Sequence, residues 1–132
     1  MFDIELIKKI NEWKVAEEGA LPICLGCDVG GSGLRVRLSS FNDSEKFVDL
    51  GHAKAKSTKE LLEVLADLEK KITEINDKFL CLGAAIAVAG PIKAGTVILT
   101  NWQGPPSGRT LTLKDLPRKL FPLDRTFFLN DL

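Results

Sequence analysis

The sequence GCDVGGSG, at residues 26–33, carries more information about the fold than any other stretch of the chain. An apolar run at residues 21–25 precedes it, and an alternating run at residues 34–38 follows it. This pattern predicts two strands joined by a tight hairpin with glycines at its tip. Because glycine admits positive φ and has no Cβ, backbone N–H groups there can approach a ligand closely. Together with the hydroxyl of Ser32, these N–H groups predict a nest for an anion.

An acidic side chain stands beside this predicted nest, because Asp28 closes the first strand. A carboxylate next to bound phosphate is a typical ligand of Mg²⁺, directly or through water. The stretch therefore indicates a clamp for the phosphates of a nucleotide. In this hypothesis Asp28 organises the metal, and the phosphates lie against Gly30, Gly31, Ser32 and Gly33.

Composition and charge exclude several classes of protein. The 132 residues carry 18 basic and 18 acidic side chains, so no basic excess points to nucleic acid or to an anionic membrane. The longest apolar stretch, residues 79–92, contains Gly and Pro and is shorter than the ~20 residues of a membrane-spanning helix. Acids among the first apolar residues argue against a signal peptide. We expect an intracellular protein of one domain.

The cysteines agree with a reducing compartment, because the chain has three of them, an odd number. Cys24 and Cys27 form a C-x-x-C pattern. In a strand, however, a spacing of three places two side chains on opposite faces of the sheet. We therefore interpret both as small strand residues and not as a redox or zinc pair.

Hydrophobic periodicity predicts the remaining elements. Residues 2–13 have the spacing of an amphipathic helix that ends before Gly19. A capping box begins at Ser57, and leucines and isoleucines recur every three or four residues behind it. The predicted elements are an N-terminal helix, three strands at 22–28, 34–40 and 46–53 that form an antiparallel meander, and a helix at 58–76.

The second half of the chain predicts fewer regular elements. Residues 80–89 are apolar throughout, which favours a parallel central strand buried on both faces. The rest is read as an extended arm at 96–101, a surface loop at 102–111, a short helix at 113–120 and a last strand at 125–129. A central strand normally runs on into a covering element. We therefore expect the chain to be the first domain of a larger protein.

This order of elements resembles the N-terminal domain of the actin-like (ribonuclease H-like) ATPase fold that hexokinases share. DVGGS at 28–32 resembles the phosphate element D-x-G-G-[TS] of that fold. AVAGP at 87–91 and LTNW at 99–102 resemble segments of bacterial-type glucokinases. LND at 129–131 resembles the N-D pair that binds and activates the sugar. The Trp of LTNW and the NDL at 130–132 are most similar to the protozoan branch of the family.

The resemblance implies an α/β domain with a mixed five-stranded sheet whose first three strands are antiparallel, flanked by helices. It implies an N-terminal helix at 1–20 and, at 21–132, the small domain of a two-domain sugar kinase whose C-terminal domain is absent here. It further implies ATP-dependent phosphorylation of glucose to glucose 6-phosphate with Mg²⁺, Asp28 organising the metal near the β- and γ-phosphates. The domain alone is expected to be inactive.

The resemblance also assigns roles on the sugar side. Asp131 is the general base that accepts the proton of the sugar's primary hydroxyl, and Asn130 binds sugar hydroxyls. Asn101, Thr100 and the backbone of Gly90 are expected near the sugar.

Other features of the sequence suggest no chemistry or depart from the pattern. Trp13 and Trp102 are interpreted as packing residues, and His52, the sole histidine, is expected to have no chemical role. Two residues depart from the pattern of the family: Ser32 replaces the usual Thr, and Gly33 replaces a polar residue that could contact phosphate.

Two alternatives stay open. One is another sugar kinase of the repressor–kinase family, although that group usually shows N-L-x-W and N-D-A where this chain has TNW and NDL. The other is a non-catalytic sugar sensor, against which the intact hairpin argues. The location stays open between the cytoplasm and a peroxisome-like organelle (glycosome), because protozoan members of the family can lie in such organelles. A homodimer of the full-length protein is one option.

Overall fold

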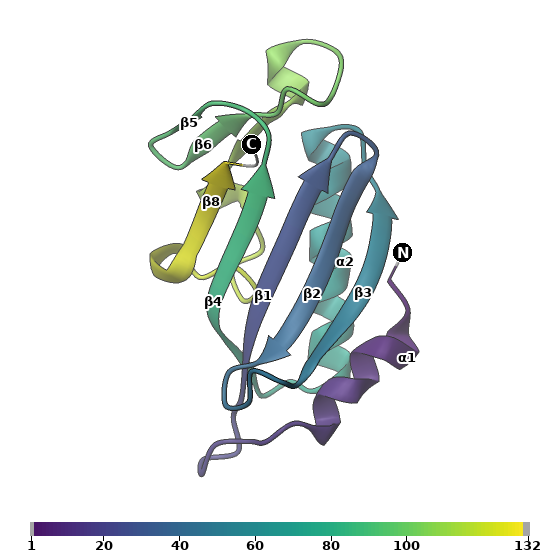
Figure 1. Ribbon diagram of the computed structural model, residues 1–132, viewed down its shortest axis with the longest axis vertical. Coiled ribbons are helices and arrows are strands. Elements are labelled where there is room, and N and C mark those ends of the chain that lie inside the picture. Colours follow the sequence, from purple (N-terminus) through teal and green to yellow (C-terminus); the bar gives the residue numbers. More distant parts are fainter. Residues whose placement is uncertain (1, 131–132) are drawn as a thin grey trace.

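The structure is a computed structural model and describes residues 2–130. Within these residues a five-stranded sheet has the order β3-β2-β1-β4-β8 (Figure 1). The first three strands are antiparallel, and β4 runs parallel to both β1 and β8. The strands are β1 (Leu21–Gly30), β2 (Gly33–Ser40), β3 (Phe47–Lys54), β4 (Phe79–Val88) and β8 (Thr126–Asn130). The predicted mixed sheet with an antiparallel meander is confirmed.

Helix α2 (Thr58–Ile75) covers one face of this sheet and lies behind it in Figure 1. The capping box is present, because the Ser57 hydroxyl accepts a hydrogen bond from the backbone N–H of Glu60 at 3.2 Å. The helix buries the side chains that the periodicity selected: Leu61, Leu65, Leu68 and Ile72. Packing this stripe against the sheet creates the core.

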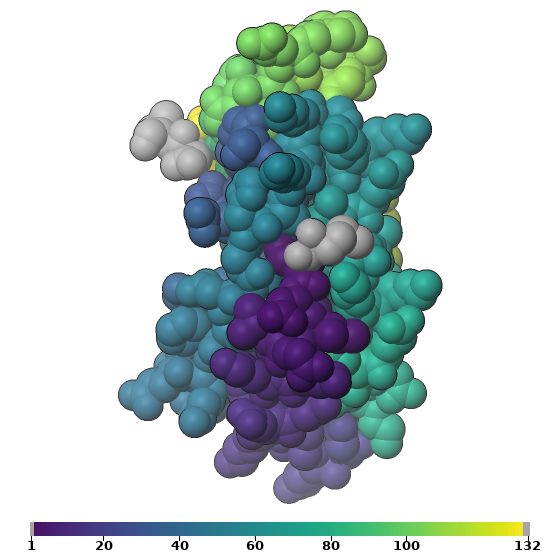
Figure 2. Space-filling view, turned by 90° about the vertical axis from the view of Figure 1, so that its right-hand side faces the viewer, coloured from purple at the N-terminus to yellow at the C-terminus, as the bar shows by residue number. Residues whose placement is uncertain are grey.

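The N-terminal segment is helical over a shorter range than predicted. Helix α1 (Ile4–Ile7) continues as the 3-10 helix Lys8–Glu12, whereas residues 13–20 form a connection with a turn instead of the helix expected up to Gly19. Trp13 is extended (φ −83°, ψ 156°) and buried, so the chain leaves the helix where this side chain enters the core. α1 lies between the strands and α2 (Figure 2).

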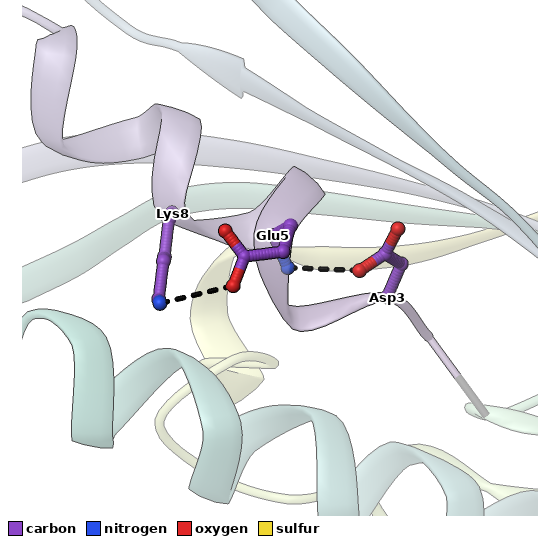
Figure 3. Close-up of polar contacts among 3 residues, drawn as sticks. All are labelled: Asp3, Glu5 and Lys8. Carbon is purple, nitrogen blue, oxygen red and sulfur yellow. Dashed lines mark hydrogen bonds and ion pairs between the residues drawn. The ribbon is translucent and has the colours of Figure 1, made fainter.

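Polar contacts on the outer side of α1 fix its first turn (Figure 3). The Asp3 carboxylate accepts a hydrogen bond from the backbone N–H of Glu5 at 2.9 Å, and Lys8 Nζ lies 3.1 Å from Glu5 Oε1. A cap of this kind satisfies a backbone donor that a helix start leaves unpaired. Within residues 2–130 no helix is long and apolar enough to cross a membrane.

The prediction that β4 is buried on both faces is wrong. Its side chains alternate between buried and partly exposed positions, and Leu80 is 50% exposed. Small side chains, Ala85 and Ala87, face a groove of about 560 Å³ on the side of the sheet opposite α2. This alternation could not be predicted from the sequence, because the β4 residues on the open face of the sheet, such as Ala85 and Ala87, are also apolar.

A second small sheet was not predicted in full. β5 (Ile92–Lys93), β6 (Thr96–Ile98) and β7 (Thr110–Thr112) pair in this order, all antiparallel. Ala94 and Gly95 both have positive φ, as in the tight turns of hairpins. β7 lies at the end of the predicted loop, and the 3-10 helix Pro106–Gly108 lies within that loop. Strands of two or three residues are too short to show a period in the sequence.

The predicted helix at 113–120 is also wrong. A 3-10 turn occupies Leu113–Asp115, and Leu116 then adopts an extended backbone (φ −73°, ψ 151°). The ring of Pro117 disfavours a helical conformation for the residue before it. The Glu69 carboxylate, on α2, instead accepts hydrogen bonds from the backbone N–H groups of Lys119 and Leu120 at 3.0 and 3.1 Å. Another 3-10 turn, Leu123–Arg125, leads into β8.

The cysteines occupy opposite faces of β1, as predicted. Cys24 is half-buried on the open face, whereas Cys27 is buried on the α2 side. Burial raises the pKa of the Cys27 thiol to about 12 and that of Cys81, on β4, to about 11. Neutral thiols are poor nucleophiles and poor metal ligands. These side chains belong to the packing of the sheet.

Replacing Cys27 by alanine should weaken the dependence of stability on alkaline pH. An unfolded Cys27 ionises above its ordinary pKa of 9.0, whereas the folded thiol holds its proton to about 12. The unfolded state therefore binds fewer protons in this range, and the free energy of unfolding falls as pH rises. Urea denaturation between pH 9 and 11 should show a slope shallower by up to about 1.4 kcal/mol per pH unit in Cys27→Ala. Equal slopes for the two proteins would show that the pKa of Cys27 is not raised in the folded state.

Candidate functional site

The glycine hairpin joins β1 to β2 with Gly31 and Ser32 at its turn, since Gly30 pairs with Gly33 across the ladder. Gly33 has φ +150°, and a Cβ at this position would lie 2.0 Å from the carbonyl oxygen of Ala53 on β3. Such a separation is far inside van der Waals contact. The departure from the polar residue of the family pattern therefore has a structural cause, the close approach of β3.

One row of residues crosses the whole sheet beside the hairpin. Cross-strand pairing aligns His52, Arg35, Asp28, Ala87 and Leu129 in that order, from β3 to β8. The three polar members of the row are exposed. With strands ~4.8 Å apart, the row places the backbone of Asp28 ~10 Å from the end of β8.

A hollow of about 160 Å³ lies beside this row, and we call it the hairpin hollow. Its lining consists of Asp28, Gly30, Ser32, Gly33, Leu34, Arg35 and His52. In it Ser32 Oγ lies 3.3 Å from His52 Nε2. The hollow thus combines a carboxylate, a guanidinium, an imidazole and a hydroxyl with glycine backbone, which suits a phosphate group and its counter-ion. No pattern in the sequence indicates that His52 lies there, because the register of β2 and β3 decides its position.

The Thr-Asn-Trp segment contacts the other side of the hairpin. The indole Nε1–H of Trp102 donates a hydrogen bond to the carbonyl oxygen of Gly30 at 3.0 Å, and the Trp102 side chain is buried. The Asn101 carbonyl oxygen would lie 3.5 Å from a Cβ on Gly31. Trp102 is therefore a packing residue, as predicted, and it also ties this segment to the hairpin.

Asn101 is exposed and lines a second hollow of about 430 Å³, which we call the loop hollow. Its lining consists of Gly31, Lys56, Asn101, Trp102 and Gln103. The hairpin tip separates the loop hollow from the hairpin hollow, because Gly31 borders the first while Ser32 and Gly33 border the second.

Thr100 and Gly90 lie at the end of β4. The backbone N–H and the hydroxyl of Thr100 both donate to the carbonyl oxygen of Ala89, at 2.9 and 3.0 Å. Gly90 has φ +152°, and a Cβ there would lie 2.0 Å from the carbonyl oxygen of Ile98. Thr100 and Gly90 thus stabilise the place where the chain after β4 passes close to β6.

Arg109 supports this segment and was missed by sequence reasoning. Its Nε–H donates to the carbonyl oxygen of Gly104 and its Nη1–H to that of Leu99, both at 3.0 Å. The backbone N–H of Leu99 in turn donates to the carbonyl oxygen of Arg109 at 2.9 Å. A single arginine in a Gly- and Pro-rich loop forms no pattern, so no signal in the sequence could have identified it.

Asn130 closes β8 and is exposed, opposite Val88 of β4. Asp131, the predicted general base, lies outside the described residues. The other predicted site residues lie at one edge of the sheet, where β1, β4 and β8 end: Asp28, Gly30, Gly31, Ser32, Gly33, Gly90, Thr100, Asn101 and Asn130. Strand register and the bond from Trp102 to Gly30 bring them there.

A magnesium ion fits this edge when phosphate supplies most of its ligands. Among residues 2–130 no group of three or more His, Cys, Asp or Glu side chains could enclose a metal ion. Asp28 offers one exposed carboxylate in the hairpin hollow. Mg²⁺ commonly uses one or two carboxylates together with water and substrate phosphates. Asp28 alone is therefore a sufficient protein ligand for a metal that arrives with a nucleotide.

Comparison with curated proteins finds two relatives that match over all 132 residues. The chain is 82% identical to "Probable glucokinase 2" and 66% identical to "Glucokinase 1", both from Trichomonas vaginalis. In each case it spans 35% of the length of the relative.

Comparison with solved structures agrees. Over 98% of this chain and 36% of the other, the glucokinase from Balamuthia mandrillaris, solved in complex with glucose, superposes with a TM-score of 0.86 at 27% identity. The Leishmania braziliensis glucokinase superposes with a TM-score of 0.68 at 22% identity over 95% of this chain and 34% of its own, which supports the actin-like fold alone. The family model for glucokinase matches residues 25–114. The chain therefore belongs to the glucokinase family.

Proposed function

We propose that this chain supplies the phosphate clamp and half of the sugar site of an ATP-dependent glucose kinase. The reaction transfers the γ-phosphoryl group of ATP to the primary hydroxyl of glucose and yields glucose 6-phosphate. One observation carries the proposal: the glycine hairpin with Asp28 and the end of β8 with Asn130 lie at the same edge of the sheet. Family membership and the glucose complex of the Balamuthia relative support the choice of sugar.

On the donor side, the hairpin would hold the phosphates of ATP. Backbone N–H groups at Gly31 and Ser32 and the Ser32 hydroxyl are the donors available at the tip. Arg35 adds positive charge on the neighbouring strand, and Asp28 would hold Mg²⁺. When bound, the metal neutralises charge on the β- and γ-phosphates. Positioning and electrostatic stabilisation supply most of the catalysis in such reactions.

On the acceptor side, Asn130 would bind sugar hydroxyls, with Asn101 and the backbone at Thr100 and Gly90 lining the same edge. Asp131 would accept the proton of the primary hydroxyl. In that step a bond forms between the sugar oxygen and the γ-phosphorus. The bond from this phosphorus to the β–γ bridging oxygen breaks, and ADP leaves. The transition state is loose, so an ordinary carboxylate suffices as the base.

Residues 21–132 would act as the small domain of a two-domain enzyme, and the N-terminal segment would belong to the same domain. The chain spans about a third of the length of its curated relatives. Among residues 2–130 both hollows beside the hairpin are open surface features of the domain. Phosphoryl transfer needs a site from which water is excluded. A second domain closing over the hairpin would provide this exclusion.

A chimera tests the function directly. Residues 1–132 replace the matching third of the Trichomonas relative that is 82% identical, and glucose 6-phosphate formation is coupled to reduction of NADP⁺ by glucose-6-phosphate dehydrogenase. We expect turnover that requires glucose, ATP and Mg²⁺, and none above background from the 132-residue chain alone. A folded chimera without glucose-dependent turnover would contradict the proposal, and so would efficient turnover by the chain alone.

Replacing Asp131 by asparagine in the chimera should lower kcat by ~10²–10⁴, the usual contribution of a general base. The amide can still bind a hydroxyl but cannot accept its proton, so KM for glucose should change little. Asp115→Asn, at an exposed position of the turn Leu113–Asp115, is the matched control and should leave kcat unchanged. Near wild-type turnover in Asp131→Asn would remove this residue from the mechanism.

A further inference from the structure

His52 is the one histidine of the sequence, and it lies beside the glycine hairpin. Its Nε2 is 3.3 Å from Ser32 Oγ, although 20 residues separate the two in the chain. The register of β2 and β3 sets this contact, because Arg35 pairs with His52 and Gly33 with Lys54. The imidazole thus faces the hydroxyl that the proposed function places on the donor phosphate.

We propose that His52 is a positioning residue that orients the Ser32 hydroxyl toward the phosphoryl donor. This inference rests on the proposed function and extends it to a residue outside the phosphate motif. A serine hydroxyl has a single proton, which it can give either to the imidazole or to a phosphate oxygen. When Nε2 carries hydrogen and donates to Ser32 Oγ, the hydroxyl proton stays available for phosphate.

Donation in this direction would strengthen the binding of phosphate in the hairpin hollow. Arg35 and Asp28 occupy the same row of the sheet, and both line the hairpin hollow with His52. A hydroxyl that accepts from an imidazole N–H becomes a better donor, since hydrogen bonds in a chain polarise one another. The same bond restricts the rotation of the hydroxyl. Both effects strengthen donor binding and leave the sugar untouched.

A role in folding does not account for the contact. His52 and Ser32 are both exposed, and the hydrogen bond between them lies at the surface. Surface hydrogen bonds add little to stability when water can replace them. Bound phosphate would displace that water, and the orientation of the hydroxyl then becomes part of the binding energy.

The kinetic test uses His52→Phe in the chimera described above. Phenylalanine keeps a ring but removes the N–H, so KM for Mg·ATP should rise about 2- to 10-fold, the effect of one hydrogen bond. We expect kcat and KM for glucose to change less than about twofold under the same argument. His52→Gln restores an N–H donor and should recover most of the lost affinity. Asp49→Asn, an exposed β3 position that contacts Arg37, is the control and should leave KM for Mg·ATP unchanged.

A double-mutant cycle distinguishes orientation of Ser32 from direct contact with the nucleotide. Ser32→Ala alone should also raise KM for Mg·ATP. If His52 acts through the hydroxyl, His52→Phe should add no further increase in the Ser32→Ala background. Increases that multiply in the double variant would overturn the proposal, as would a His52→Phe chimera with unchanged KM for Mg·ATP.

Nuclear magnetic resonance gives a readout that needs no turnover. Since the chain has one histidine, its ring ¹⁵N signals are unambiguous in the 132-residue protein. Adding Mg·ADP should shift them toward the form that carries hydrogen on Nε2, and Ser32→Ala should reduce the shift. Unchanged ring signals on saturation of the hairpin amides would overturn the proposal. An inactive chimera with the expected ring shifts would contradict the sugar-kinase function while supporting the role of His52.

Discussion

One hydrogen bond connects the two halves of the candidate site, the bond from the Trp102 indole N–H to the Gly30 carbonyl oxygen. It joins residues 72 apart in the sequence, and the indole that donates it is buried. β3 also packs against the hairpin at Gly33, and Ala89 and Arg109 also hold the Thr-Asn-Trp segment. The Trp102 bond links these two anchored elements to each other. Because an unpaired buried N–H is costly, the indole holds both in a fixed relation. The hairpin and the Thr-Asn-Trp segment are therefore held in one fixed arrangement.

Close approach of neighbouring backbone at two glycines also determines how the hairpin and the Thr-Asn-Trp segment are placed. β3 approaches Gly33 and β6 approaches Gly90, each so closely that a Cβ would lie 2.0 Å from a carbonyl oxygen. Arg109 then holds the loop behind Trp102 through two backbone carbonyls. Gly33 and Gly90, which the motifs predicted to lie near a ligand, are thus also required by the packing of the backbone.

Long elements and local motifs were predictable from the sequence, whereas contacts set by register were not. The capped helix α2 and the five strands of the main sheet follow from periodicity and turn residues, since each signal lies within a few neighbours. The short strands β5–β7 were not predicted because two or three residues show no period. The non-helical segment around Pro117 was not predicted because Glu69, which binds its backbone, lies 50 residues away in the sequence. Ser32 and His52 are 20 residues apart in the sequence, and the pairing of β2 with β3 brings their side chains together.

The bond from Trp102 should couple the mobility of the hairpin to that of the Thr-Asn-Trp segment. Amide hydrogen exchange in Trp102→Phe tests it most directly, because phenylalanine keeps an aromatic ring but cannot donate the bond to Gly30. Exchange at residues 31–33 and at residues 100–104 should accelerate together, by about 2- to 10-fold for the loss of one hydrogen bond. Acceleration of one segment alone, or of neither, would show that the Trp102 bond does not couple the two segments.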